Sequence, residues 1–274
     1  MMYSRRSHLR LICGALAAGI RSGRAASGDI SSYHDAEKEN FLKLAKILAV
    51  EQIGHGVTKP LKVKLELNGA QHLGQIQTVD KDLPDFFPQS GPPVPMRDSW
   101  RFNVAAYKID RLLSLNMVPV TVQRTFKARP AAFTWWVDDV MFEEVERIKK
   151  DLIAPDPENF ARQRALGSLF DELIINIDRN LANLLITNSW NVVLIDHSRS
   201  FTAYHGIRNE AKLSRCSVAV MAKLKALTLS QVTASVGTLL TDAESRALMA
   251  RRDLIVDWFE RAAKAQGVDH VLFS

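Results

Sequence analysis

Three oxygen-bearing side chains lie around one predicted loop and one predicted hairpin in the second half of this chain. Asp178 follows a helical stretch, Asn183 comes five residues later, and Asp196 ends the hairpin. The hairpin is predicted by two short apolar runs, 184–187 and 192–195, on either side of the turn-forming sequence Asn-Ser-Trp-Asn. Because a hairpin returns the chain to its start, we expect Asn183 and Asp196 to be close together, with Asp178 facing them across the loop.

This set of side chains suits phosphoryl transfer. The reaction needs oxygen ligands for Mg²⁺ on the nucleotide phosphates, and a carboxylate that orients and deprotonates the attacking hydroxyl. We therefore assign Asp178 as the catalytic base, and Asn183 and Asp196 as the metal ligands, because a hard cation prefers carboxylate and amide oxygens. An Asp in a loop after a helix is also a common turn former, so the assignment depends on the helix and hairpin around it.

Alternating apolar and polar residues in the first half predict a small antiparallel sheet. Residues 61–67 alternate in this way, and Asn68-Gly69 predicts a tight turn into a strand over 71–79. A helix comes first, and the order after it is β-β-β-α-β-β. The predicted elements are a helix over 28–50, three strands within 50–79, a loop over 82–96 with five of the ten prolines, a helix capped by Asp98 or Ser99, and strands over 117–125 and 131–137.

From residue 138 onward the pattern is mainly helical. Residues 140–152 predict one helix, and Asp156-Pro157 predicts the start of another, since Asp is a good N-cap and Pro is favoured at the first helical position. An amphipathic stretch over 242–266 predicts a long helix. We therefore expect an α+β chain with a sheet-containing part over 28–137 and a mainly helical part over 138–274.

The spacing Asp178-x-x-x-x-Asn183, followed by the hairpin and Asp196, resembles the protein-kinase-like superfamily. The form Asp-Arg-Asn-x-x-Asn is most similar to the atypical branch that contains the phosphoinositide 3-/4-kinases and the actin-fragmin kinase, whose loop commonly reads Asp-Arg-His-x-x-Asn. It differs from the His-Arg-Asp of typical protein kinases, because an Asn and an Ile precede Asp178, and Asp-His-Ser at 196–198 differs from Asp-Phe-Gly. The resemblance covers residues 50–205.

This resemblance implies a two-lobed fold, with a small antiparallel-sheet N-lobe and a helical C-lobe that match the two parts above. It implies ATP and Mg²⁺ as cofactors, and transfer of a phosphoryl group to a hydroxyl of a protein, a lipid headgroup or a small molecule. It also places Gly54 and Gly56 in a turn that covers the phosphates, and Trp136 and Val137 in the hinge beside the adenine. Glycines in a strand-to-strand turn need no ligand, and a tryptophan here serves equally well in packing.

Two positions depart from the kinase pattern. A kinase carries a Lys on its third strand and a Glu on the following helix, and this ion pair orients the phosphates. The resemblance places Gln77 and Asn103 at these positions, so two neutral amides replace both charges. Either Lys64 or its neighbour Lys62 supplies a cation from the adjacent strand, or the chain is a pseudokinase that binds nucleotide or acts as a scaffold without phosphotransfer.

The net charge of the chain is concentrated at its start. The 274 residues carry a net charge of +6, but residues 1–27 contain five Arg and no acid, so residues 28–274 carry only +1. We therefore expect no nucleic-acid partner. Two cysteines, Cys13 and Cys216, exclude a disulfide framework, and no apolar run is long enough for a transmembrane helix.

Residues 1–27 have the layout of an export signal or a disordered basic tail. Basic residues precede an apolar stretch over 11–20, small residues follow it, and Arg5-Arg6 resembles a twin-arginine signal. Two further arginines lie between the apolar stretch and any cleavage point, which argues against processing. Because an exported protein would lack periplasmic ATP, we expect a cytoplasmic protein, with export as the alternative.

Overall fold

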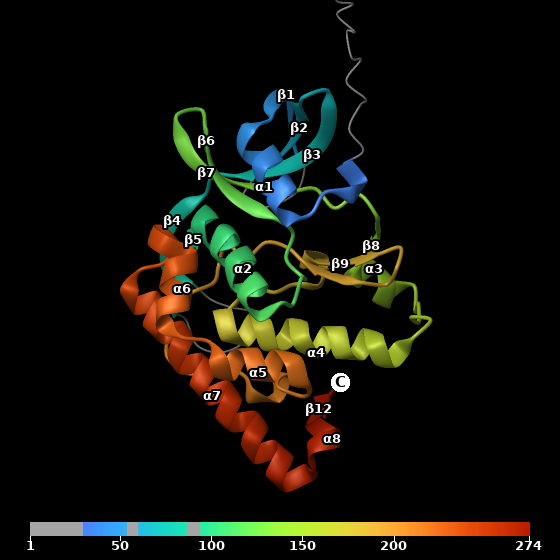
Figure 1. Cartoon of the computed structure of the whole chain (residues 1–274), viewed down its shortest axis with the longest axis vertical. Coiled ribbons are helices and arrows are strands. Elements are labelled where there is room, and N and C mark those ends of the chain that lie inside the picture. The colour runs from blue at the N-terminus through green and yellow to red at the C-terminus, as the bar shows by residue number, and fades with distance from the viewer. Residues whose placement is uncertain (1–29, 54–59, 87–93) are drawn as a thin grey trace, which may run out of the picture.

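The computed structural model describes residues 30–53, 60–86 and 94–274, and it has two lobes (Figure 1). A cleft lies between them. The N-lobe is built on an antiparallel sheet of five strands in the order β1-β2-β3-β7-β6. Its strands are β1 (Lys46–Gln52), β2 (Leu61–Leu67), β3 (Ala70–Gln77), β6 (Thr121–Phe126) and β7 (Arg129–Trp135). The expected α+β, two-lobed architecture is confirmed.

The predicted helix over 28–50 is wrong in its second half. Helix α1 (Asp35–Leu44) ends at the extended residue Ala45, and residues 46–52 form β1 instead. Val50 faces Val63 across the β1–β2 pair, so β-branched residues and pairing with β2 determine the local structure. The apolar residues that match a helical period up to Leu48 belong partly to a helix and partly to an edge strand.

The predicted proline-rich loop over 82–96 is also partly wrong. Residues on both of its sides form an antiparallel pair, β4 (Asp80–Phe86) and β5 (Val94–Ser99). Pro84 lies in the irregular part of the ladder between Leu83 and Phe86. A two-stranded pair has only edge strands, which tolerate a proline because not every N–H is needed.

Helix α2 (Trp100–Leu113) begins where the sequence predicts. The Ser99 hydroxyl accepts a hydrogen bond from the Arg101 N–H at 3.3 Å and caps the helix. The strands expected over 117–125 and 131–137 are β6 and β7. Their two-residue turn, Lys127-Ala128, has φ of 47° and 61°, as tight hairpin turns require.

The C-lobe contains most of the helices (Figure 1). The helix predicted over 140–152 is shorter, because residues 140–143 form a strand whose Phe142 pairs with Ile186 of the predicted hairpin. The remaining elements are β8 (Val140–Glu143), α3 (Glu144–Lys149), α4 (Pro157–Ile174), β9 (Leu184–Thr187), β10 (Val192–Leu194), β11 (Cys216–Ser217), α5 (Val218–Ala226), α6 (Leu229–Val236), α7 (Asp242–Gln266), α8 (Val268–Val271) and β12 (Leu272–Phe273).

Helices α4 and α7 match their predictions closely. Asp156 caps α4 by accepting a hydrogen bond from the Asn159 N–H at 2.9 Å, and α7 has the predicted bounds. The wholly buried Arg251 of α7 donates a hydrogen bond to the Leu173 carbonyl at 2.7 Å, near the end of α4. This contact supports the helix end that leads to Asp178. Among the described helices, none is both long and apolar enough to cross a bilayer.

Candidate active site

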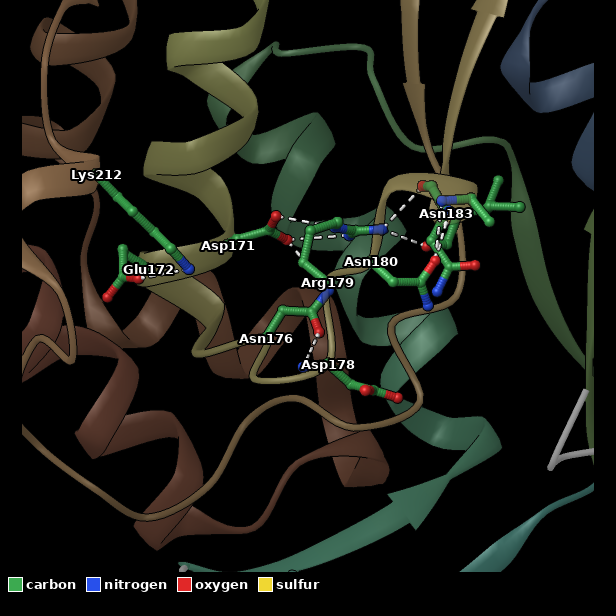
Figure 2. Close-up of polar contacts among 10 residues, drawn as sticks. Asp171, Glu172, Asn176, Asp178, Arg179, Asn180, Asn183 and Lys212 are labelled. Carbon is green, nitrogen blue, oxygen red and sulfur yellow. Dashed lines mark hydrogen bonds and ion pairs between the residues drawn. The ribbon is translucent and has the colours of Figure 1, made fainter. Parts of the chain in front are cut away.

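The loop after α4 holds Asp178 at its tip. The helix stops at Ile175, which has the left-handed φ of 51°. The Asn176 side chain then donates to an Asp171 carboxylate oxygen at 3.1 Å and accepts from the Asp178 N–H at 3.3 Å. Asn176 thus fixes the backbone of Asp178. The carboxylate of Asp178 points away from these contacts (Figure 2).

Arg179 joins the loop to its surroundings. Its guanidinium forms two hydrogen bonds with Asp171 at 2.9 and 3.0 Å, and donates to the carbonyls of Asn183 at 2.9 Å and Ile195 at 2.6 Å (Figure 2). Both charged side chains are less than a tenth exposed. A planar guanidinium suits this arrangement because its N–H groups form a rigid fork. Arg179 therefore holds the Asp178 loop and both ends of the hairpin in one arrangement.

The hairpin brings Asn183 and Asp196 together as expected. Asn180 caps the short 3₁₀ turn before β9 by accepting from the N–H groups of Ala182 at 2.9 Å and Asn183 at 3.1 Å. Across the hairpin, the N–H of Ile195 donates to the Asn183 carbonyl at 3.1 Å. Asp196 follows with φ of 53°, a left-handed conformation that Asp tolerates better than most residues.

A cavity of about 700 Å³ lies between the lobes, and the side chains of Asp178, Asn183 and Asp196 all line it. Trp136 and Val137, the two predicted hinge residues, line the same cavity. The lining includes the polar and hinge residues Gln75, Thr134, Trp136, Val137, Asp138, Glu143, Asp178, Asn183, Asp196 and Arg199. Gly54 and Gly56 lie outside the described residues, so their predicted place above the phosphates stays a prediction.

Gln77 and Asn103, at the predicted lysine and glutamate positions, contact each other. The Asn103 amide donates to Gln77 Oε1, and Gln77 Nε2 donates to Asp196 Oδ1 at 3.2 Å. Asn103 Oδ1 also accepts from the His197 N–H at 2.8 Å. Both amide side chains are buried. This network, which we call the amide bridge, connects β3 and α2 to the segment that carries Asp196.

Arg199 is the residue of the site that was not identified from the sequence. Its Nε donates to Asp98 Oδ2 at 2.9 Å and its Nη1 donates to Asp178 Oδ2 at 2.8 Å. Burial, together with the nearby Asp196 charge, raises the pKa of Asp178 above its usual value, although Arg199 acts in the opposite direction. Arg199 follows Asp196 by three residues, which was the only signal that it could belong to the site. The spacing did not indicate that its side chain contacts Asp178.

The two candidate lysines lie on β2 outside this cavity lining. Lys64 is exposed and pairs in register with Leu73, away from the catalytic loops. Lys62 pairs with Gln75, and its ammonium lies 4.6 Å from the centre of the Trp136 ring. Lys62 is therefore the nearer of the two to the hinge.

The oxygen donors of the cavity fit a hard divalent cation such as Mg²⁺. Asn183 and Asp196 would hold the ion. In the part of the chain that the structure describes, no three His, Cys, Asp or Glu side chains form a metal site by themselves. In nucleotide sites, Mg²⁺ is usually bound by one or two carboxylates together with substrate phosphates.

Comparison with sequences gives no family. No family model matches the chain, and no curated protein matches it.

Comparison with solved structures shows the fold. The structure of hydra Fam20 with sugar is similar to this chain, with a TM-score of 0.67 at 14% identity. The similarity covers 90% of this chain and 93% of the hydra chain. The Golgi casein kinase with Mn/ADP bound has a TM-score of 0.64 at 12% identity, over 87% and 78%. The Helicobacter pylori proinflammatory kinase CtkA has a TM-score of 0.52 at 11% identity, over 82% and 98%. The chain thus has an atypical kinase-like fold.

Proposed function

We propose that this protein is a kinase-like phosphotransferase that uses Mg-ATP to phosphorylate a hydroxyl group. The observation that carries the proposal is the meeting of Asp178, Asn183 and Asp196 in one cavity of about 700 Å³ between two lobes. A cavity of this size is in the range of small-molecule sites. The Golgi casein kinase, whose structure has Mn/ADP bound, shares the fold and supports nucleotide and metal binding here.

Asp178 is the proposed base. Its loop is fixed through Asn176 and Arg179, and its carboxylate faces the cavity. Because burial raises its pKa, this carboxylate accepts a proton more readily than an exposed aspartate does. An acceptor hydroxyl within hydrogen-bond reach would be oriented by Asp178 for attack on the terminal phosphoryl group and would give up its proton to it.

Asn183 and Asp196 are the proposed metal ligands, and Trp136 and Val137 the adenine-side contacts. A bound Mg²⁺ would supply neutralisation of the negative charge that develops on the phosphates. The hairpin fixes the backbone of Asn183, and the amide bridge engages Asp196 Oδ1. Lys64 and Gln77 were further predictions for nucleotide binding. Gln77 acts in this proposal through Asp196 rather than as a direct phosphate contact.

The resemblance to kinases leaves the class of acceptor open. A hydroxyl of a lipid headgroup, a protein or a small molecule would be served by the same base. We therefore propose only the type of reaction, and the experiment below offers all three classes of acceptor.

A pseudokinase is the second candidate, because the amide bridge replaces the usual ion pair. Two neutral side chains in a buried contact carry no charge to orient phosphates. In that case the protein would bind nucleotide, or act as a scaffold, without transferring phosphate.

The test is phosphate transfer from radiolabelled Mg-ATP by the purified full-length chain. Wild type, Asp178→Asn and the surface control Asp257→Asn are compared, with lipid vesicles, casein and small alcohols as acceptors. A phosphotransferase labels an acceptor or releases phosphate, and Asp178→Asn lowers the rate at least about 100-fold. Mg-ATP binding with equal background rates in all three proteins would instead support the pseudokinase.

A further inference from the structure

The wall of the cavity has an unusual charge distribution for a site that takes a nucleotide. Among the described residues that line it, one is basic, Arg199, and four are acidic: Asp138, Glu143, Asp178 and Asp196. Gln77, at the lysine position, contacts Asp196 and Asn103. A triphosphate that enters this cavity therefore meets one fixed protein cation among the lining side chains.

Arg199 is held firmly beside the proposed base. Its guanidinium is bound through Nε to Asp98 at 2.9 Å and through Nη1 to Asp178 at 2.8 Å, and its side chain is 14% exposed. A guanidinium has five N–H groups in one plane, so it can bind a phosphate oxygen while it stays anchored to a carboxylate. Arg199 is thus fixed beside the proposed base and lines the cavity.

Asp98 fixes this cation relative to α2. Its carboxylate is almost fully buried and lies one residue before the cap of that helix. The N–H of Ser99 also donates to the Ser198 carbonyl at 2.8 Å, which ties the segment before Arg199 to the same place. A kinase uses a Glu on the corresponding helix to orient its lysine. Here a carboxylate at the start of α2 orients an arginine that comes from the other lobe.

We propose that Arg199, anchored by Asp98, is the residue that binds the nucleotide phosphates in place of the missing strand lysine. The inference rests on the proposed function, since it concerns the same cavity. It also accounts for the neutral amide bridge: with the cation supplied from the C-lobe side, Gln77 and Asn103 serve to position Asp196. Phosphate binding would draw the guanidinium from Asp178 toward the ligand and leave that carboxylate available to the acceptor hydroxyl.

The experiment separates binding of the nucleotide phosphates from binding of the adenine and ribose. Affinity for Mg-ATP is measured by calorimetry and affinity for adenosine by ligand-observed NMR, for wild type, Arg199→Gln, Arg199→Lys and the surface control Arg261→Gln. We expect Arg199→Gln to weaken the affinity for Mg-ATP at least about tenfold, and a tenfold loss corresponds to about 1.4 kcal/mol. The affinity for adenosine should be unchanged. Arg199→Lys should retain part of the affinity, because it keeps the charge but not the planar fork. Arg261→Gln should match wild type, because Arg261 lies in an exposed pair with Asp257 on α7.

Loss of Arg199 leaves Asp98 buried without this partner, so folding needs its own control. The double variant Asp98→Asn/Arg199→Gln removes both charges, and circular dichroism melting shows whether it folds. This folded double variant should show the same selective loss of Mg-ATP affinity.

Three results would overturn the inference. The first two are an unchanged Mg-ATP affinity in Arg199→Gln and an equal loss of adenosine and Mg-ATP affinity in that variant. The third is a loss of Mg-ATP affinity in a further variant, Lys62→Met, while Arg199→Gln keeps the wild-type affinity. Failure of the wild type to bind either ligand contradicts the proposed function itself, and with it this inference. Wild-type binding that is insensitive to Arg199 contradicts the inference alone.

Discussion

Gln77 and Asp196 are 119 positions apart in the sequence, yet the amide of Gln77 donates to the carboxylate of Asp196 at 3.2 Å. The bond joins a strand of the N-lobe to the proposed metal ligand of the C-lobe. Asn103 completes the contact by donating to Gln77 and accepting from the His197 N–H. A bridge of this kind holds the metal ligand in position without adding charge to the cavity.

The first prediction concerns the ion pair that kinases carry at the positions that the resemblance assigns to Gln77 and Asn103. The double variant Gln77→Lys/Asn103→Glu puts opposite charges in the buried bridge. If the chain is a phosphotransferase that positions Asp196 through neutral amides, the change lowers Mg-ATP affinity, because the introduced ammonium competes with the metal for the Asp196 carboxylate. Calorimetry measures this effect. A gain of phosphate-transfer activity over an inactive wild type would instead identify a pseudokinase that lost its ion pair.

The second prediction concerns the charge of Asp196. Asp196→Asn keeps a residue that tolerates the left-handed φ of 53°, whereas Ala at this position would add backbone strain. We expect Asp196→Asn to melt within a few degrees of wild type and to lose the Mg²⁺-dependent part of ATP binding. Thermal shift with ATP, with and without Mg²⁺, measures both. A full Mg²⁺ effect in the variant would contradict the assignment of this ligand.

The third prediction concerns the stability that Arg179 provides. Arg179→Met leaves the buried Asp171 carboxylate without its two-bond partner, and removal of one member of a buried pair costs about 3–5 kcal/mol. Urea unfolding of the variant should show this loss. The control Arg261→Met, in an exposed pair with Asp257, should change stability by less than about 1 kcal/mol. Similar small effects in both variants would show that Arg179 does not hold the loop.

The fourth prediction is the pH dependence of phosphate transfer. Since burial raises the pKa of Asp178, its carboxylate becomes protonated at a higher pH than an ordinary aspartate does. The base is active only when ionised, so kcat/KM should fall as the pH is lowered through this raised pKa, above the usual value of 3.8. The same shift means that ionisation of Asp178 takes stability from the fold as the pH rises through that range.

A pH-rate profile of the wild type tests the fourth prediction. Arg199→Gln, which removes the charge that opposes the shift, should move the acid limb to still higher pH. A limb at the ordinary aspartate value in both proteins would contradict the role of burial.

Local patterns in the sequence predicted the elements that depend on local signals. Helix α7 has the predicted bounds because a cap and an amphipathic period define it, and Thr241 with Glu244 forms a capping box at its start. The hairpin between Asn183 and Asp196 was predicted correctly for a similar reason. Strand β1 was not, because Lys46–Gln52 becomes a strand only by pairing with β2, a contact that the local period does not contain.

The candidate site shows the same division. The meeting of Asp178, Asn183 and Asp196 followed from a loop and a hairpin close in sequence. The contact that anchors Arg199 could not be predicted in this way, because Asp98 lies 101 positions away and is buried at the start of a different helix. Long-range pairs of this kind need the packed lobes, so Lys62 and Lys64 were named from the sequence and the arginine was missed.

Arg179 bonds to the carbonyls of both Asn183 and Ile195 and to Asp171 of α4, so it ties the two loops at the bottom of the cleft to the C-lobe. If the lobes separate, the contacts that stretch therefore include Gln77 with Asp196 and Asp98 with Arg199, together with the backbone bonds of His197 and Ser99. Opening would release the orientation of a proposed metal ligand and of a proposed phosphate ligand in the same movement. Product departure and inactivation of the site would then be a single conformational event.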